Sequence, residues 1–405
     1  MMFNFTTYDD YLTCREQLLQ KFSSSQFGES HGLETSDLKQ FYRDLRKAVI
    51  DKGYPAVTNV KNHEFNYFDL NIYSRYQRQG HKFIGEGKHV YEMLYGATKQ
   101  KQMNLNGFFT SSCQVGNYTL LNVLKSVFPD SPLYHPTEVL YFESLFILNR
   151  LRELSNFKGN GKKIYFLDST GILDESTLLE FANDPASIEL IIFDTTCYDR
   201  QSEFISRVVD RACELKLPIV MTRSHLKLDS FGWEYGSLGS LLFINFPERT
   251  LYEQCHEYLS QVGGFAFLDQ IYPFLFDQSL KDLNSWRVEQ IRKNNLYISN
   301  EVKKNNSYLD GWITSKHHQL FHLAIYDRSK NEILKIGERF VALCKVYDLE
   351  AYFCDSFGFD FFSLTHFDSV DFHGNGCMRF CSPVNKDEVE KSILIVNKLI
   401  QYVQR

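Results

Sequence analysis

The sequence lacks several features that would by themselves define a class of protein. No apolar stretch approaches the roughly 18 residues that a membrane-spanning helix needs. The opening residues also lack a basic region followed by an apolar core, as a secretory signal would have. The formal net charge is -6, with no arginine-rich arm, so neither nucleic acid nor an anionic membrane is an expected partner. We therefore expect a cytoplasmic protein.

Paired cysteine spacings are missing as well. The chain has 9 cysteines, and Cys377 and Cys381 have no second pair nearby to complete a metal site. An odd number without a framework favours reduced thiols over disulfides. The sequence thus predicts neither a disulfide scaffold nor a metal centre.

What is present is enough apolar material for two domains, with 405 residues of which 43% are hydrophobic. We expect an N-terminal helical segment and arm over residues 1–70, where ETSDLKQFYRDLRKAVIDKG has a helical pattern between a capping Thr or Ser and a closing Gly. A large domain should follow over residues 71–285. A smaller α+β domain, with a long polar helix and a terminal helix from about Lys386, should cover residues 286–405.

The large domain has the pattern of an α/β fold. Short apolar segments (KKIYFLD, IELIIFD, LPIVMTR, SLLFINF) alternate with helix-like ones (QVGNYTLLNVLKSVF, SEFISRVVDRACELK). Such alternation predicts crossover units and a mostly parallel sheet. Ligands of these sheets bind outside the carboxyl ends of the strands, which directs attention to Asp168, Asp194 and the stretch 222–227.

Three groups of polar residues follow strands in this way. Ser111, Ser112 and Cys113 open a helix, whose free amides and dipole suit a phosphate, although serines also cap helices without any ligand. Asp194 can pair with a protonated ring nitrogen or simply cap its loop. Lys227 comes after the next strand, and a buried amine there is easily deprotonated and becomes nucleophilic. A phosphate cradle, an acid and an amine are the three groups that bind pyridoxal phosphate.

The order of these elements resembles the fold-type I pyridoxal-phosphate enzymes, and within them the cystathionine synthase and lyase group. Tyr73-Ser74-Arg75 is similar to the YSR element of that group, whose Tyr and Arg reach the cofactor phosphate of a neighbouring subunit. TSSCQVG takes the place of its SGMAA loop, and LYHPTEVLYF resembles its VYGGT segment. The resemblance implies that Tyr134 stacks on the pyridine ring.

Four more segments extend the resemblance to about residue 402. FDTTCY is similar to DNTF, which implies that Asp194 pairs with the ring nitrogen and Thr196 lies beneath the ring. SHLK matches the S-x-x-K element, with Ser224 on the phosphate and Lys227 as the Schiff-base lysine. DSFG and CMRFCSP resemble SLGG and R-x-S, which implies that Ser356 and Arg379 bind the α-carboxylate of the substrate.

The resemblance implies a three-layer α/β/α fold like that of aspartate aminotransferase, with pyridoxal 5'-phosphate as cofactor and an amino acid as substrate. Lys227 would remove the α-proton, with elimination or replacement at Cγ or Cβ and possible proton transfer by Tyr134. A homodimer or homotetramer with shared active sites would follow. Two alternatives remain, an aminotransferase and a non-catalytic binding scaffold of the same fold.

Departures from the family pattern fall around the pocket. Tyr76-Gln77-Arg78-Gln79 replaces the Gly-Asn-Pro-Thr turn that usually follows YSR, and Leu226 replaces the threonine before the lysine. The spacing of glycines after Lys227 also resembles that of aminotransferases, but Tyr235 stands where their phosphate-binding arginine would be. The substrate side chain is therefore left open.

Overall fold

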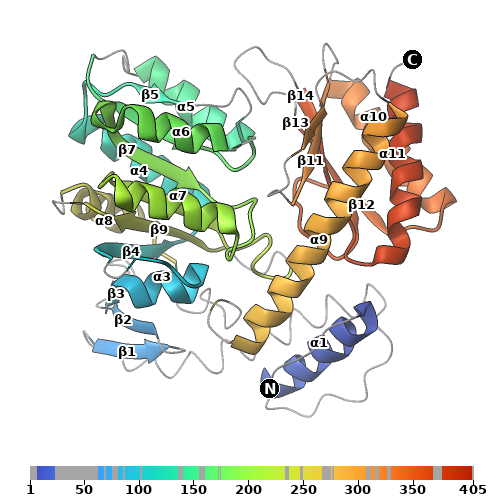
Figure 1. Ribbon diagram of the computed structural model, residues 1–405, viewed down its shortest axis with the longest axis horizontal. Coiled ribbons are helices and arrows are strands. Elements are labelled where there is room, and N and C mark those ends of the chain that lie inside the picture. Colours follow the sequence, from blue (N-terminus) through green and yellow to red (C-terminus); the bar gives the residue numbers. More distant parts are fainter. Residues whose placement is uncertain are drawn as a thin grey trace.

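The computed structural model shows two β-sheets joined by one long helix (Figure 1). It describes residues 7–22, 63–67, 70–74, 81–84, 87–100, 103–135, 140–154, 160–171, 173, 175–232, 237–246, 250–266, 275, 278–306, 312–314, 319–325, 330–367 and 376–403. The helix expected around residues 34–53 lies outside this part of the chain. Among the described helices, none combines the length and the apolar character needed to cross a bilayer.

The large sheet has nine strands in the order β1-β2-β3-β4-β9-β8-β7-β6-β5. Its strands are β1 (His63–Tyr67), β2 (Leu70–Ser74), β3 (His81–Ile84), β4 (Leu105–Thr110), β5 (Leu133–Tyr134), β6 (Lys163–Leu167), β7 (Ile188–Asp194), β8 (Ile219–Ser224) and β9 (Gly239–Ile244). Strands β5 to β8 are parallel, and β9 runs antiparallel to both β8 and β4. Strand β4 therefore points the same way as β5 to β8, and the carboxyl ends of all five lie at one edge.

Helices cover both faces of this sheet. On one face lie α3 (Gly87–Tyr95), α6 (Glu175–Asn183) and α7 (Glu203–Glu214), and on the other α4 (Cys113–Val127), α5 (Phe142–Leu154) and α8 (Thr250–Val262). Alternate residues of β7 enter the two cores, Ile191 with the first group and Ile192 with the second. Because β7 is buried on both faces, its sequence is a continuous apolar run. The predicted three-layer α/β arrangement is confirmed.

The smaller C-terminal unit is an α+β structure. Its sheet has the order β10-β11-β14-β13-β12. The strands are β10 (Trp312–Thr314), β11 (Phe321–Ile325), β12 (Ala351–Phe353), β13 (Phe362–Phe367) and β14 (Gly376–Cys381), packed with α10 (Lys330–Val346) and α11 (Val389–Val403). The predicted terminal helix is confirmed, with a 3-10 turn at Lys386–Glu388 preceding α11.

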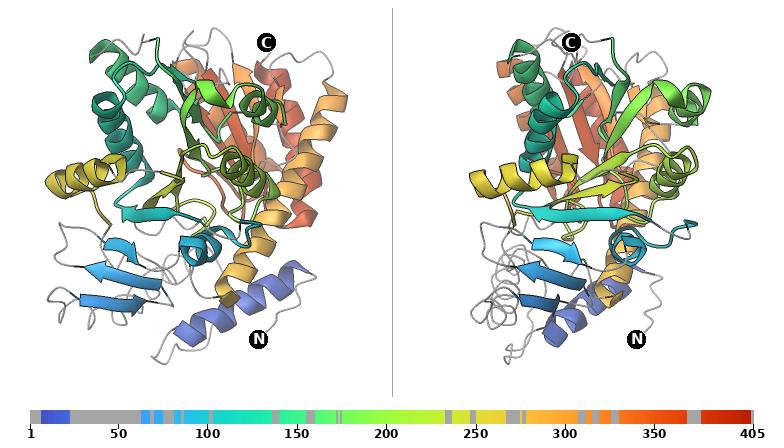
Figure 2. Two further views of the ribbon diagram at one scale, coloured as in Figure 1. Left: turned by 60° about the vertical axis from the view of Figure 1, so that its left-hand side comes forward. Right: turned by 90° about the vertical axis from the view of Figure 1, so that its left-hand side faces the viewer.

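Helix α9 (Gln278–Asn305) connects the two units, running along the small domain and past the large one (Figure 1). Its residues enter three cores in succession: Leu283 packs in the large domain, Ile291 at the junction and Ile298 in the small domain. Helix α1 (Tyr8–Phe22) lies against the first half of α9 (Figure 2). The long polar helix expected near the start of the small domain is thus the element that positions one domain against the other.

The expected domain limits differ from the structure at two points. Strand β1 and the start of β2 precede residue 71 but are hydrogen-bonded into the large sheet. Helix α9 begins at Gln278 and has no break at 285. Short polar strands such as HEFNY have no strong apolar alternation, so the boundary near 70 could not be read from periodicity.

A buried ionic cluster anchors the loop after β8. Asp229 accepts hydrogen bonds from Arg223 Nε and Nη2 at 2.7 Å each, and Arg200 Nε lies 3.3 Å away. His225 Nδ1 lies 2.7 Å from the same carboxylate, and its Nε2 lies 2.8 Å from Ser240 Oγ on β9. Burial alone would raise the pKa of Asp229, but Arg223 and Arg200 lower it below its usual value. The ionised carboxylate therefore fixes the first part of the loop that contains Lys227 to the end of β8.

Replacing Asp229 with Asn should lower the free energy of unfolding by about 3 to 5 kcal/mol, because two buried arginines would lose their counter-charge. Urea unfolding of the purified variant measures this loss. Glu214→Gln is the control, since Glu214 is 58% exposed and pairs with Arg211 on the surface; it should cost less than about 1 kcal/mol. Equal losses in the two variants would contradict the anchoring role of Asp229.

Candidate active site

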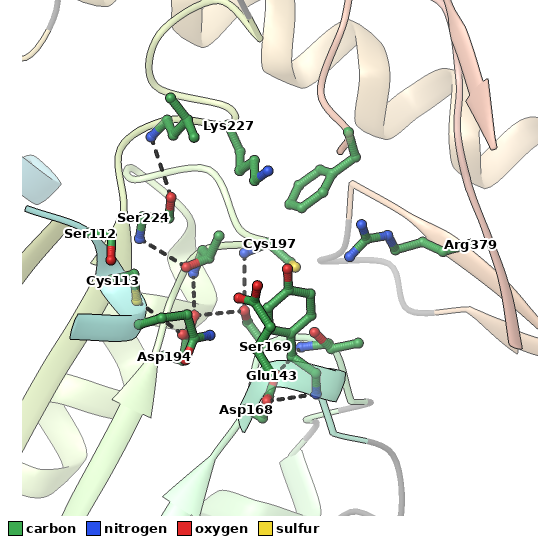
Figure 3. Close-up of a pocket in the computed structure, with 16 residues that line it drawn as sticks. Ser112, Cys113, Glu143, Asp168, Ser169, Asp194, Cys197, Ser224, Lys227 and Arg379 are labelled. Atoms are coloured by element: carbon green, nitrogen blue, oxygen red, sulfur yellow. Dashed lines mark hydrogen bonds between the residues drawn. The ribbon is translucent and has the colours of Figure 1, made fainter. Parts of the chain in front are cut away.

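A pocket of about 260 Å³ lies at the carboxyl edge of the large sheet, between that sheet and the small domain. Its volume is close to the lower end of the range for small-molecule sites, about 300 Å³. The residues that line it are Ser112, Cys113, Gln114, Tyr141, Glu143, Asp168, Ser169, Thr170, Asp194, Thr196, Cys197, Ser224, Leu226, Lys227, Phe357 and Arg379 (Figure 3). Seven of the twelve residues predicted from the sequence are in this set: Ser112, Cys113, Asp194, Thr196, Ser224, Lys227 and Arg379.

The first turn of α4 forms one wall of the pocket. Ser112 is the N-cap residue, in extended conformation, and its Oγ accepts the amide of Val115 at 3.1 Å. This is ordinary capping, in which the hydroxyl satisfies one of the amides that the first turn of a helix leaves without an intrahelical partner. Ser111 is not part of the lining. A side chain at Gly239 would collide with the backbone of Cys113, so a glycine there permits the close approach of β9 to this turn.

The carboxylate of Asp194 is held by three donors. Its Oδ1 accepts the hydroxyl of Ser169 at 3.1 Å and the amide of Thr196 at 2.8 Å. Its Oδ2 accepts the thiol of Cys113 at a longer 3.5 Å. Burial and the nearby Asp194 raise the pKa of the Cys113 thiol well above its usual value, so the thiol stays protonated and donates. Asp194 is 6% exposed, and the three donors fix the orientation of its carboxylate in the pocket.

Thr196 and Ser224 connect the ends of β7 and β8. The amide of Ser224 donates to Thr196 Oγ1 at 3.0 Å, and the amide of Leu226 donates to Ser224 Oγ at 3.4 Å. The hydroxyls of Thr196 and Ser224 therefore hold the backbone just before Lys227. Figure 3 shows these contacts on the same side of the pocket as Asp194.

Lys227 reaches the pocket from the loop after β8. Its Nζ donates to Ser356 Oγ of the small domain at 2.6 Å, and its carbonyl accepts the amide of Gly232 at 2.9 Å. Gly232 has a φ of 68°, and a side chain there would clash with the carbonyl of Gly358. The lysine loop and the loop that contains Ser356 are thus packed backbone to backbone.

Arg379 enters from the opposite side, from strand β14 of the small domain. Its guanidinium carbon lies 4.5 Å from the centre of the Phe357 ring, and Nη2 donates to Thr365 Oγ1 at 3.5 Å. The side chain is 2% exposed. Stacking on Phe357 orients the planar fork of the arginine. Ser356 lies next to Phe357, so both residues predicted to bind a carboxylate are close to this wall.

The structure does not bring Tyr134 into the pocket lining. Tyr134 is 37% exposed on the two-residue edge strand β5, packs edge-on against Tyr165 at 4.9 Å, and has the amine of Lys163 5.4 Å from its ring centre. Tyr141, seven residues later in the same segment LYHPTEVLYF, lines the pocket instead. The amide of Tyr141 donates to Asp168 Oδ2 at 2.9 Å. The segment LYHPTEVLYF thus contributes its second tyrosine, and not its first, to the pocket.

Two predicted residues are not placed by the structure. Tyr73 lies on β2, but its side chain is outside the described part of the chain, and so is Arg75 altogether. Their expected contribution to a neighbouring subunit, and with it the homodimer or homotetramer, remains a prediction.

Sequence reasoning passed over several pocket residues, among them Glu143, Cys197 and Phe357. Asp168 was noticed only as a residue that follows a strand. It accepts the amides of Tyr141 and Thr170, and burial with the charge of Asp194 raises its pKa to about 6. The carboxylates of Asp168 and Asp194, at the ends of the neighbouring strands β6 and β7, therefore both line the pocket.

No protein-family model and no curated protein matches the sequence. Solved structures do match. Cystathionine gamma-lyase from yeast aligns with a TM-score of 0.51 and 12% identity, over 82% of this chain and 88% of that chain. Cystathionine gamma-lyase from Lactobacillus plantarum, complexed with L-serine, aligns with a TM-score of 0.50 and 12% identity, over 82% and 89%. The chain therefore has the α/β fold of these fold-type I structures, as the sequence predicted.

The raised pKa of Asp168 predicts a pH-dependent stability difference. A buried carboxyl with a folded-state pKa near 6, against a usual 3.8, stabilises the fold below pH 3.8 and loses that contribution as the pH rises through 6. Asp168→Asn removes this dependence. The free energy of unfolding of Asp168→Asn minus that of the wild type should therefore rise by about 2 kcal/mol between pH 4 and pH 7.

Urea unfolding at several pH values measures this difference. The amide also changes the hydrogen bonds to Tyr141 and Thr170, but that effect is the same at each pH and cancels in the comparison. A difference that stays constant from pH 4 to pH 7 would show that Asp168 is already ionised in the fold at acidic pH.

Proposed function

We propose that this protein is a pyridoxal-phosphate-dependent enzyme that removes the α-proton of an amino acid and then eliminates or replaces a group at Cγ or Cβ. The observation that carries the proposal is the convergence of Lys227, Asp194, the first turn of α4 and Arg379 on one pocket. They come from three strand ends of the large domain and one strand of the small domain. Two solved structures with the same fold are described as cystathionine gamma-lyases, which supports this class of reaction.

The pocket residues fit the chemical groups of the cofactor. Asp194 is a buried carboxylate whose Oδ2 makes only a long contact with a thiol, a weak interaction that a ring N–H would replace with a stronger, charge-assisted one. The start of α4, with Ser112 and Ser224, offers amides and hydroxyls for the phosphate. Lys227 would hold the aldehyde carbon. Tyr141 and Thr196 line the same pocket as the acid and the amine, as residues on the two faces of the ring would.

When bound, the cofactor supplies an electron sink that stabilises negative charge at Cα of the substrate. The carboxylate of Asp194 favours the protonated form of the ring nitrogen. Arg379, held in plane by Phe357, binds and orients the α-carboxylate. Once the amino group of the substrate has replaced it on the cofactor, the amine of Lys227 would take the α-proton, and Ser356 Oγ, which accepts from this nitrogen at 2.6 Å, would orient it.

The proposal is tested by borohydride reduction after incubation with pyridoxal 5'-phosphate. We expect a visible absorbance band that reduction abolishes, with the reduced cofactor attached to Lys227 in peptide mass spectra. Lys227→Ala should form no adduct, and Lys345→Ala, an exposed lysine of α10, should behave as the wild type. If the wild type forms no such adduct, the proposed enzyme is rejected in favour of the binding scaffold.

The reaction type is tested by incubation with vinylglycine, cystathionine, O-acylated homoserines and halogenated amino acids. Release of a keto acid together with the leaving group indicates elimination. An aminotransferase would instead need a second keto acid and leave the pyridoxamine form of the cofactor. Loss of the base in Lys227→Ala should lower turnover about 10² to 10⁴ fold.

The two tyrosines of the segment LYHPTEVLYF form a matched pair for the stacking role. We expect Tyr141→Ala to weaken cofactor binding about 10 to 100 fold, since an aromatic contact contributes about 1.5 to 3 kcal/mol on burial. Tyr134→Ala should leave it unchanged, because that ring packs on Tyr165 outside the pocket. Absorbance titration with pyridoxal 5'-phosphate gives both dissociation constants, and a stronger effect of Tyr134→Ala would reverse the assignment.

A further inference from the structure

One loop of the small domain, residues 354–361, contacts both key side chains of the pocket; we name it the serine loop. Ser356 Oγ accepts the amine of Lys227, and Phe357 lies under the guanidinium of Arg379. The next residue, Gly358, packs against the backbone at Lys227. The position of this loop therefore sets the orientation of the proposed base and of the proposed carboxylate-binding residue.

Asp360, at the far end of the serine loop, is the centre of a partly buried ionic cluster. Its Oδ2 accepts the hydroxyl of Tyr11 and Nη1 of Arg15, at 3.0 Å each. Arg287 of α9 donates to its Oδ1 and also to the carbonyl of Gly358. The side chain of Asp360 is 12% exposed, while that of Arg15 is 6% exposed and that of Arg287 fully buried. Two cations and one hydroxyl thus hold a single carboxylate of the loop.

Two of these three partners belong to helix α1, which contributes to neither sheet. The helix begins with a reciprocal cap, in which Thr7 and Asp10 each accept the backbone amide of the other, at 3.1 and 2.9 Å. One turn later the ring of Tyr11 stacks on Trp286 of α9 at 5.5 Å. Helix α1 is therefore fixed against α9 (Figure 2). In this position Tyr11 and Arg15 both reach Asp360.

We propose that α1 is a positioning element of the active site, in which Tyr11 and Arg15 act through Asp360 to hold the serine loop against Lys227 and Arg379. The inference rests on the proposed function for its catalytic consequence. The chain of contacts is continuous: α1 to Asp360, then along the backbone of the loop to Phe357 and Ser356. Arg287 keeps Asp360 paired when α1 is altered, so the domain should stay folded while the loop loosens.

The test compares three variants of α1 in the full chain. Arg15→Met removes the charge but keeps an aliphatic stem, and Tyr11→Phe removes only the hydroxyl and keeps the ring on Trp286. Gln17→Met is the matched control, because it places the same new side chain at an exposed position of the same helix. Hydrogen exchange measured by mass spectrometry reports the opening of residues 354–361 without any ligand.

We expect amides of the serine loop to exchange at least about 10 fold faster in Arg15→Met than in the wild type, since the loop loses a charge-assisted hydrogen bond. Tyr11→Phe should have a smaller effect in the same segment, and Gln17→Met none. Arg15→Lys, which can still donate to Asp360, should recover most of the protection. Exchange in Arg15→Met equal to that in Gln17→Met would overturn the proposal.

A second measurement separates positioning from general stability. In the protein loaded with pyridoxal 5'-phosphate, the pH midpoint of the visible band reports on the surroundings of Lys227 Nζ, which lies beside Ser356 Oγ. A displaced Ser356 should therefore shift this midpoint in Arg15→Met relative to the wild type and to Gln17→Met. An unchanged midpoint together with faster exchange would show that α1 only adds stability, and would also overturn the proposal.

The failure of this inference is distinct from the failure of the proposed function. If the wild type forms no borohydride-stable adduct, the proposed function is wrong, and hydrogen exchange still decides whether α1 holds the serine loop. If the adduct forms and the variants of α1 match Gln17→Met in both measurements, only the inference is wrong.

Discussion

The common direction of β4 and of β5 to β8 is the constraint on which the site depends. Since these strands all end at one edge of the large sheet, residues more than a hundred positions apart in the chain, such as Ser112 and Lys227, line one pocket. The antiparallel strand β9 lies between β4 and β8, and a glycine at its start lets the first turn of α4 approach closely. The geometry of the pocket is thus a property of strand order and direction before any side chain is considered.

Buried carboxylates have three different roles around this edge. Asp229 is surrounded by Arg223, Arg200 and His225, and remains ionised as the anchor of the lysine loop. Asp194 is held by a hydroxyl, an amide and a thiol, which are all neutral donors. Asp168, without a cation among its hydrogen-bond partners, has a raised pKa because of burial and the charge of Asp194. The difference follows from whether an arginine, a set of neutral donors or another acid lies nearby.

The pocket also depends on how the two domains meet. The large domain contributes the amine and the acid, and the small domain contributes Arg379 and the serine loop. Helix α9 passes through the cores of both domains and presents Arg287 to Asp360 at their junction. Helix α9 therefore supports the relation between Lys227 and Arg379, and α1 adds further contacts at the same carboxylate.

Much of this could be predicted from the sequence because the signals are local. Short continuous apolar runs and the helical segments between them identified β6 to β9, α4 and α7, and residues directly after strands identified Asp194 and Lys227. The position of Tyr134 outside the pocket could not be predicted, because a motif match cannot show that β5 is only two residues long and that the chain reaches the pocket seven residues later. The contact between Tyr11 and Asp360 joins residues 349 positions apart. The sequence by itself determined which segments are strands and which polar residues end them, since hydrophobic periodicity is encoded within each segment. Only the tertiary structure decided which tyrosine faces the pocket and what α1 holds, because those depend on packing between segments whose partners no local pattern specifies.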